Sequence, residues 1–561
     1  AMNLTDGKIL WRTQDSQFNA TNQAISLEAA ARGTVAVGLQ GRRTVALLSA
    51  KDGKPLDPDA AQEAGKNFFR YRNHICTPSL RVGDVVLNNR GGNLSQAGKN
   101  TNFGGARASC LTGTVPAYGA GYIAQNWCRC SPGQISGLLA IAPIGKMLSP
   151  AEMERPAQPV IHNSYDESTD GISSPSLWTS FRGNARRSSG AARDIPSEVE
   201  VAWSSQVAGA MKEGTVQRDW RSYLNSRLTP AVVTGDSAIL GDVNHNEIIA
   251  VDLKDGGVKW RFMTGGRVDS TPTIHKGICL AGDHAGYVYA IRIKSGELLY
   301  KLRVAPEEKR MISYGKVESV WPVIGGVMIA EGTAYASAGR TQGSDGGLVV
   351  RAFKPETGKQ AWAKALPQQG GDLLEKKPKR NDVLVRDGEF LTIMGHWLRL
   401  DTGKISPQPA GEKRNRTITM GLDGLGSWNW TRLGHRKFMH VGYGEFKGDT
   451  VCWNERFAAT SNKDSGGSIV SLANPGQRQG FSGVSEVYQA TSMVICNNAL
   501  IQGGAILDQK EHRGFIRAIR LEDGQVIWEK KFGAKLAFNG LAVDHRGIIA
   551  SFDDGTVVCL K

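Results

Sequence analysis

The stretch VDLKDGGVKW, residues 251–260, joins one apolar strand pattern to a second through Asp-Gly-Gly and ends on Trp260. Asp-Gly supplies the positive φ angle that a tight hairpin turn requires. The same device recurs along the chain as MNLTDGKILW (2–11), IRIKSGELLY (291–300), FKPETGKQAW (353–362) and IRLEDGQVIW (519–528). This repetition predicts one small structural unit used many times, not a series of unrelated domains.

Each copy is preceded by two more short strand patterns. Across residues 268–303 the four patterns read VDSTPTI, GICLAG, YVYAIRI and LLYKLRV. Four short antiparallel strands in about 35–50 residues are typical of a propeller blade. The sequence therefore predicts an all-β fold: a single β-propeller over residues 1–561 with about eight four-stranded blades and an irregular insertion at about 147–197. The Trp that ends a copy should lie between blades and cover its neighbour's turn.

The two ends of the chain carry complementary parts of one unit. The last residues, DGTVVCLK (554–561), match a third strand, and the segment LTDGKILWR (4–12) matches the fourth strand that should follow. We therefore expect the N-terminal strand to complete the C-terminal blade and close the ring, leaving no free sheet edge.

The bulk composition limits the possible partners. Lysine and arginine number 68 against 53 acidic residues, which gives a net charge of +15. Such an excess speeds the capture of anionic partners without saying which anion. No apolar run approaches the length of about 18 residues needed to span a bilayer. Basic residues are not interleaved with aromatic residues along one stripe, so we expect no nucleic-acid role.

The repeat resembles the PQQ-like (quinoprotein-type) β-propeller superfamily. More narrowly, VDSTPTIHKGICLAGDHAGYVYAI (268–291), APEEKRMISYGKVESVWPV (305–323), AGRTQGSDGG (338–347) and CLTGTVPAYGAGYIAQNWCRC (110–130) are similar to large exported proteins of environmental bacteria. This resemblance implies a secreted or periplasmic protein. The resemblance also suggests a quinone-dependent dehydrogenase. Enzymes of that class resemble one another in an adjacent Cys-Cys pair that lies over the cofactor. No Cys-Cys occurs in this sequence, so we expect no PQQ and predict no cofactor.

Four of the eight cysteines crowd into the early part of the chain: Cys76, Cys110, Cys128 and Cys130. In an exported protein two longer disulfides would be the natural pairing, because Cys-x-Cys does not readily bridge to itself. Four thiolates holding a structural zinc ion are the alternative. Cys279, Cys496 and Cys559 lie in apolar strand patterns and are expected to be small core residues.

Propeller geometry indicates where a ligand site could form. In a four-stranded blade, the loop that leads into the first strand and the loop between the second and third strands emerge on one face. These loops supply three candidate catalytic residues, His245, His284 and Tyr314. Candidate substrate-binding residues in the same loops and in the irregular early blades are Arg227, Arg267, Arg310, Arg340, Glu318, Trp321, Arg90, Arg107 and His74.

Arginine, histidine and tyrosine without a nucleotide or metal motif suit β-elimination on an acidic polysaccharide. Arginine neutralises the carboxylate and acidifies the neighbouring C–H, His245 or His284 removes that proton, and Tyr314 protonates the leaving oxygen. We therefore predict a polysaccharide lyase that acts, as a monomer, on a uronate-containing or sulfated polysaccharide. The alternative is a non-catalytic scaffold or glycan-binding propeller. A glycoside hydrolase, which needs a pair of carboxylates, and a PQQ-dependent dehydrogenase rank below these two.

Overall fold

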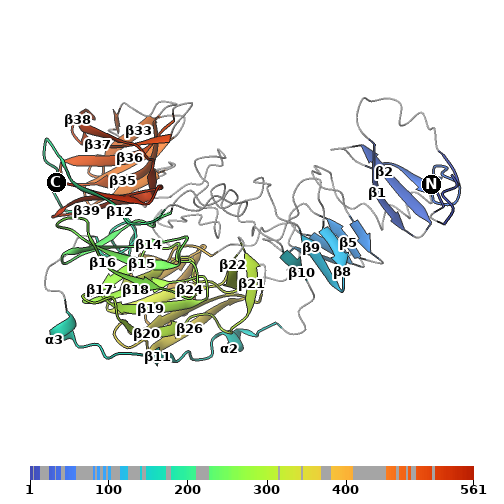
Figure 1. Ribbon diagram of the computed structural model, residues 1–561, viewed down its shortest axis with the longest axis horizontal. Coiled ribbons are helices and arrows are strands. Elements are labelled where there is room, and N and C mark those ends of the chain that lie inside the picture. Colours follow the sequence, from blue (N-terminus) through green and yellow to red (C-terminus); the bar gives the residue numbers. More distant parts are fainter. Residues whose placement is uncertain are drawn as a thin grey trace. The chain divides into compact units, whose positions relative to one another are not determined.

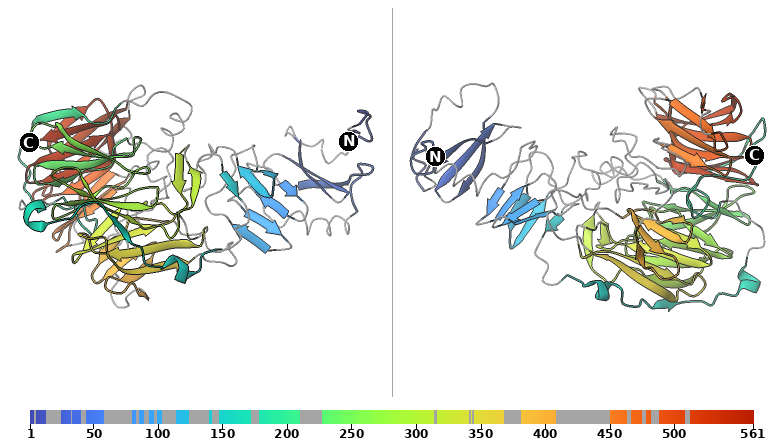
Figure 2. Two further views of the ribbon diagram at one scale, coloured as in Figure 1. Left: turned by 60° about the horizontal axis from the view of Figure 1, so that its bottom comes forward. Right: turned by 180° about the vertical axis from the view of Figure 1, so that it is seen from behind.

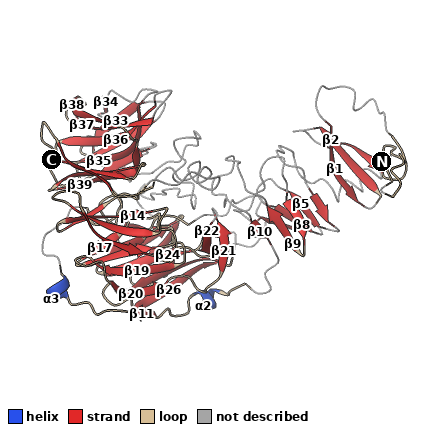
Figure 3. Cartoon of the chain, in the orientation of Figure 1, coloured by secondary structure: helices blue, strands red, loops and turns tan. Residues whose placement is uncertain are grey.

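The computed structural model is built almost entirely from antiparallel strands, as predicted (Figures 1 and 3). The structure describes residues 1–3, 5–12, 25–31, 33–39, 44–57, 80–82, 85–88, 93–96, 99–102, 114–123, 139–141, 147–171, 178–209, 227–313, 316–340, 342, 345–367, 381–407, 450–462, 466–474, 478–481, 488–507 and 512–561. The described residues before 147 form one compact unit, unit 1, and those from 147 onward form a second, unit 2.

Unit 1 contains three antiparallel sheets among its described residues. They are β1 (Ile25–Ala31), β2 (Thr34–Leu39) and β3 (Thr44–Ser49); β4 (Leu80–Val82), β5 (Val85–Asn88), β6 (Asn93–Gln96) and β7 (Lys99–Asn102); and β8 (Thr114–Ala117), β9 (Ala120–Ile123) and β10 (Leu139–Ile141).

Among its described residues, unit 2 contains seven sheets that each include four consecutive antiparallel strands; six are four-stranded, and the one with β17–β20 gains a fifth strand. The first three are β13 (Val232–Thr234), β14 (Ser237–Asp242), β15 (Glu247–Asp252) and β16 (Val258–Met263); β17 (Thr273–His275), β18 (Ile278–Gly282), β19 (Tyr287–Arg292) and β20 (Leu298–Arg303); and β23 (Val327–Ala330), β24 (Thr333–Ala338), β25 (Gly347–Phe353) and β26 (Gln360–Pro367). A separate hairpin, β21 (Arg310–Ser313) and β22 (Lys316–Ser319), lies between the second and third sheets in sequence.

The remaining four sheets follow the same pattern. They are β27 (Val385–Asp387), β28 (Phe390–Ile393), β29 (His396–Arg399) and β30 (Ile405–Ser406); β31 (Thr450–Trp453), β32 (Phe457–Asn462), β33 (Gly466–Ser471) and β34 (Arg478–Phe481); β35 (Tyr488–Ile495), β36 (Ala499–Leu507), β37 (His512–Arg520) and β38 (Val526–Phe532); and β39 (Leu536–Asp544), β40 (Gly547–Phe552), β41 (Thr556–Leu560) and β12 (Val201–Gln206). The expectation of about eight blades in one 1–561 domain stays a prediction, since the two units are described separately.

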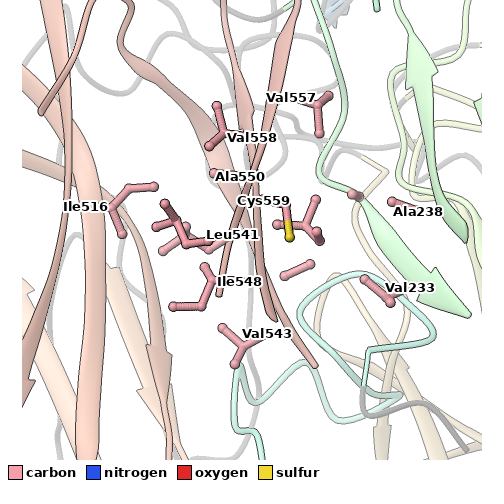
Figure 4. Packing of buried hydrophobic residues seen from close by; sticks show 14 of the residues in the cluster. Val233, Ala238, Ile516, Leu541, Val543, Ile548, Ala550, Val557, Val558 and Cys559 are labelled. Carbon is pink, nitrogen blue, oxygen red and sulfur yellow. The ribbon is translucent and has the colours of Figure 1, made fainter. Parts of the chain in front are cut away.

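Hydrophobic clusters connect each sheet of unit 2 to the next. Figure 2 shows these sheets from two further sides. The largest cluster joins the last two sheets to the first, because it holds Ile516 of β37, Leu541 of β39, Cys559 of β41 and Val233 of β13 (Figure 4). The packing order of the sheets in unit 2 is therefore circular, as in a propeller, whose radial repetition leaves only short, protected sheet edges. The predicted aromatic docking is confirmed: a Cβ on Gly296 would lie 2.8 Å from the Trp260 ring, and one on Gly403 would lie 2.5 Å from Trp362.

The strand that completes the C-terminal sheet differs from the prediction. β41 pairs with β12, so the edge expected to receive residues 4–12 is filled by residues 201–206. Residues 2–9 instead form their own bridge between Met2 and Ile9, and Trp11 donates from Nε1 to the carbonyl of Ala50, 2.9 Å away, within unit 1. The expectation of N-terminal closure is thus wrong. The segment VEVAWSSQ (199–206) has a similar strand pattern that also carries a Trp, and it pairs with β41 instead.

The expected insertion at 147–197 has little regular structure in its described residues. It contains α2 (Pro150–Met153), α3 (Glu167–Asp170) and one short strand, β11 (Pro159–Ile161), which adds to the outer edge of β20. Its last part, residues 178–191, we call the central segment. This segment hydrogen-bonds to residues of all seven first strands: Val233, Ile274, Val327, Arg386, Trp453, Ile495 and Asn539. It therefore lies where the first strands of the sheets converge.

Two arginines of the central segment are buried there. Arg182 donates to the carbonyls of Arg187 and Val451 and to Oδ1 of Asn539, and Arg187 donates to the carbonyls of Leu384 and Phe181. Burial lowers the pKa of Arg182 to about 10; burial and the nearby Arg182 charge lower that of Arg187 to about 9. The backbone φ of Arg182 and of Arg187 is 57°, so the segment turns sharply to aim both side chains inward.

Candidate functional site on the loop face of unit 2

The candidate site lies on one face of the sheets in unit 2, which we call the loop face. Its components are the β14–β15 turn (243–246), the β18–β19 turn (283–286) and the loops that lead into β17 and β23, the latter carrying the β21–β22 hairpin. These segments meet because alternate connections of antiparallel strands emerge at the same edge of a sheet.

Four of the predicted residues come together in a buried group that we call the ion cluster: Arg267, His284, Glu318 and Arg340, with Asp269 as a fifth member. Asp269 Oδ2 lies 2.9 Å from His284 Nε2, and Glu318 Oε2 lies 3.0 Å from His284 Nδ1. Arg267 Nη2 lies 3.2 Å from Glu318 Oε1, and Arg340 Nη2 lies 2.6 Å from Glu318 Oε2. The structure thus brings Arg267, His284, Glu318 and Arg340 together on the loop face; their role in binding or catalysis stays a prediction.

Attraction between the carboxylates and the arginine and histidine side chains stabilises the buried ion cluster. Burial alone would raise the pKa of Glu318, but the charges of Arg267, His284 and Arg340 outweigh it and hold that pKa far below its ordinary value. The pKa of Asp269 is lowered in the same way by His284 and Arg267 against the effect of burial. The side chain of His284 is 0% exposed and each of its ring nitrogens faces a carboxylate, so His284 is poorly placed to remove a proton from a substrate.

His245, the other predicted base, has a different setting in the β14–β15 turn. Its side chain is 47% exposed, and its Nδ1 lies 2.7 Å from Oδ2 of the buried Asp242. Oδ1 of Asp242 accepts hydrogen bonds from the backbone N–H groups of Asn244 and His245. Asp242 therefore fixes the turn and orients the imidazole, the arrangement in which a carboxylate prepares a histidine for proton transfer.

Lys316, which the sequence interpretation did not select, lies beside this turn. Its Nζ donates to the carbonyl of Asn244 at 2.7 Å and to Oδ1 of Asn246 at 3.0 Å. Burial and the charge of Arg267 lower its pKa to about 8. Lys316 begins β22, so the β21–β22 hairpin carries an amine with a lowered pKa to the two residues that flank His245.

The other predicted residues lie apart from this arrangement or outside the described residues. Arg310 is exposed on β21 and pairs with Glu308, and Arg227 donates to the carbonyl of Asp554 at 2.9 Å. Trp321 is buried and donates from Nε1 to the carbonyl of Asp345. Outside the described residues lie Tyr314, His74, Arg90, Arg107 and the four early cysteines, Cys76, Cys110, Cys128 and Cys130. Cys279, Cys496 and Cys559 are buried core residues, as predicted.

The comparison with family models agrees with the architecture. Residues 200–369 match the family model described as outer membrane protein assembly factor BamB, a PQQ-like repeat family. Residues 200–369 therefore resemble the PQQ-like β-propeller superfamily. The match covers the first three sheets of unit 2, which carry the ion cluster, His245 and Lys316. No curated protein matches the sequence.

Solved structures of this superfamily are similar at low identity. BamB from Moraxella catarrhalis is 13% identical with a TM-score of 0.30, over 60% of this chain and 81% of that chain. The quinohemoprotein alcohol dehydrogenase ADHIIG from Pseudomonas putida HK5 is 13% identical with a TM-score of 0.44, over 72% and 83%. A europium-containing methanol dehydrogenase is 12% identical with a TM-score of 0.34, over 69% and 82%. At these values none carries an argument about function.

On the part of the loop face that the structure describes, the residues do not fit the quinone cofactor, with its accompanying calcium ion, that the resemblance to quinone-dependent dehydrogenases suggests. Calcium would need several oxygen ligands, yet Asp269 and Glu318 on the loop face are already paired with arginine and histidine. The sequence also lacks the adjacent cysteine pair. In the part of the chain that the structure describes, no group of three or more His, Cys, Asp or Glu could hold a metal ion. No helix in that part is long and apolar enough to cross a membrane.

Proposed function

We propose that this PQQ-like propeller is an exported carbohydrate-active enzyme, a lyase that cleaves an acidic polysaccharide by β-elimination. The observation that supports it most is the half-exposed His245, oriented by the buried Asp242 and flanked by Lys316 on the loop face. The net charge of +15 favours capture of a polyanion. Export is proposed from the family model's description, because outer-membrane assembly takes place beyond the cytoplasm.

His245 is the proposed base. It removes the proton from the carbon that bears the uronate carboxylate, and the C–H electron pair becomes a carbon–carbon double bond to the neighbouring carbon. The glycosidic C–O bond on that neighbouring carbon breaks, and its oxygen leaves with a proton from an acid. Tyr314, which lies outside the described residues, is proposed for the acid because it follows Ser313 directly in the sequence. Nearby positive charge stabilises the negative charge that develops on the carboxylate.

A panel of acidic polysaccharides tests the reaction class. Incubation of the full chain with each polymer should increase the ultraviolet absorbance of an unsaturated uronate, together with one new reducing end per cleavage. Reducing ends without absorbance would replace elimination with hydrolysis. Binding with neither product would exclude catalysis on that polymer.

The second candidate is a non-catalytic propeller that binds a glycan or serves as a scaffold in outer-membrane assembly. Two observations favour it: the match of residues 200–369 to the BamB family model, and the engagement of Arg267, His284 and Arg340 in internal ion pairs. Under this alternative the ion cluster stabilises the fold, and the panel gives binding without products.

A further inference from the structure

Arg182 and Arg187, the two arginines of the central segment, are buried without an acidic partner among the described residues. Their exposed fractions are 2% and 1%. Apart from burial, the groups that act on their charges are Cys452, beside Arg182, and Arg182 itself, beside Arg187; no described carboxylate does so. The ion cluster on the loop face differs, because each of its arginines faces a carboxylate. The central segment therefore holds two like charges inside the protein with no described counter-charge.

The hydrogen bonds of the two side chains do not use all of their N–H groups. A guanidinium has five N–H donors. Arg182 donates to three acceptors, the carbonyl of Arg187 at 2.9 Å, Oδ1 of Asn539 at 2.7 Å and the carbonyl of Val451, which leaves two donors. Arg187 donates to four backbone carbonyls, which leaves one donor. The remaining N–H groups can hold an acceptor that carries a negative charge.

The hydrogen bonds that are present do not compensate the two charges. A carbonyl or amide oxygen carries only a partial negative charge, whereas each guanidinium carries a full positive charge. Burying a charge is unfavourable unless an opposite charge pairs with it. Repulsion between the two guanidinium groups adds to this penalty. An anion in contact with both groups would offset the burial and the repulsion together.

We propose that Arg182 and Arg187 bind a small inorganic anion, a halide such as chloride, where the first strands of the sheets in unit 2 converge. A monatomic ion accepts hydrogen bonds from any direction, so it can be shared by the remaining N–H groups of two side chains. The near-complete burial of both arginines favours an ion of this size over the carboxylate of a sugar. The inference does not depend on the proposed lyase, whose residues lie on the loop face.

The backbone around the two side chains supports a ligand at this place. Arg182, Arg187 and Ser189 have φ angles of 57°, 57° and 56°, in the left-handed region that residues other than glycine rarely adopt. Asn539, which accepts from Arg182, has a φ of 52° and lies where the register of β39 with β40 shifts. Residues strained in this way gather at ligand clamps. The central segment and β39 thus both depart from regular geometry to bring polar groups to one point.

The stability of the full chain as a function of chloride tests the site. An ion that binds only the folded protein lowers the unfolding constant in proportion to its concentration, once that concentration exceeds the dissociation constant. Urea unfolding is measured in mixtures of sodium chloride and sodium gluconate at constant ionic strength, so that general screening of charge stays the same. A tenfold rise in chloride should lower the unfolding constant of wild type by up to about tenfold.

Arg182→Gln and Arg187→Gln each remove one charge and should reduce this dependence to less than about twofold. Arg351→Gln is the matched control. Arg351 is also buried and donates to the carbonyls of Val304 and Met153, so its substitution should destabilise the protein but keep the chloride dependence of wild type. Equal dependence in wild type and in both central variants, or no dependence in wild type, would overturn the anion site.

Anomalous diffraction from the wild-type protein tests the same site without any substitution, which covers the case of central variants that fail to fold. Crystals of the full chain grown in sodium bromide should show an anomalous peak in contact with the guanidinium groups of both Arg182 and Arg187. No peak at this place, or a larger and non-spherical ligand there without a bromide signal, would overturn the halide.

Discussion

Trp203 of β12 covers Gly256 in the turn of the neighbouring sheet, so closely that a Cβ at Gly256 would lie 2.6 Å from Cε3 of the indole. Nε1 of the same ring donates to the carbonyl of Leu253 at 3.0 Å. On the preceding sheet, Trp528 donates to the carbonyl of Pro196, just ahead of β12. The chain of aromatic contacts therefore passes through β12, and β12 links the last sheet of unit 2 to the first.

Trp203→Ala should destabilise unit 2 strongly. Truncating a buried Trp typically costs about 3–5 kcal/mol, through lost burial and the cavity that remains. Denaturant unfolding followed by circular dichroism measures the free energy of unfolding. Gly209→Ala is the control, since nothing lies within 4 Å of an added Cβ there. A Trp203→Ala value equal to that of the control would contradict closure by β12.

Arg187→Ala should cost about 2 kcal/mol or more, because it leaves the carbonyls of Leu384 and Phe181 without their donor and opens a cavity at the convergence of the first strands. Its neighbour Arg186 is exposed, so Arg186→Ala should change the free energy of unfolding by no more than about 0.5 kcal/mol. Thermal and denaturant unfolding compare the pair. Equal stabilities would show that the central segment does not hold the sheets together.

Glu318→Gln should both destabilise the protein at neutral pH and flatten its acid response. The folded-state pKa of Glu318 lies below its ordinary value of 4.5, so its contribution to stability is complete above that pH and is lost as the pH falls through the folded-state pKa. Unfolding free energies at pH 7 and pH 4 should differ less in the variant than in wild type. Glu522→Gln changes an exposed position and should keep the wild-type difference in unfolding free energy between pH 7 and pH 4. If Glu318→Gln also kept that difference, a residue other than Glu318 would be responsible for the acid sensitivity.

Asp242→Asn should lower kcat on an acidic polysaccharide by up to about a hundredfold with little change in KM, because the ring of His245 loses the carboxylate that orients it. Steady-state rates of unsaturated product measure both constants. A rise in KM at constant kcat would instead assign Asp242 to substrate binding.

The sequence predicted some parts of this molecule better than others. The Asp-Gly turn and the Trp that follows are local signals, and their docking was correctly predicted at Trp260 and Trp362. The closing strand was not, because β12 and β41 pair across the whole of unit 2 with no turn between them. At the site, the loop-face argument found Arg267, His284 and Arg340 but not their burial, which depends on carboxylates contributed by separate loops.

Lys316 and Asp242 illustrate what sequence patterns leave out. Lys316 contacts Asn246 and Asn244, which lie 70 and 72 positions earlier in the chain, so no local sequence pattern indicates this contact. Asp242 carries a weak signal, since an Asp three residues before a His in a polar turn is typical of side-chain capping of that turn.

The rate of unsaturated product formation in wild type, His245→Gln and His545→Gln tests the central claim most directly. His545 is a matched control: it is 48% exposed, its Nδ1 lies 3.0 Å from the buried Asp544, and it occupies the β39–β40 turn on the opposite face of the sheets. The account predicts a loss of about 10²–10⁴-fold for His245→Gln and a wild-type rate for His545→Gln. Equal rates for wild type and His245→Gln on a uronate polymer would contradict it.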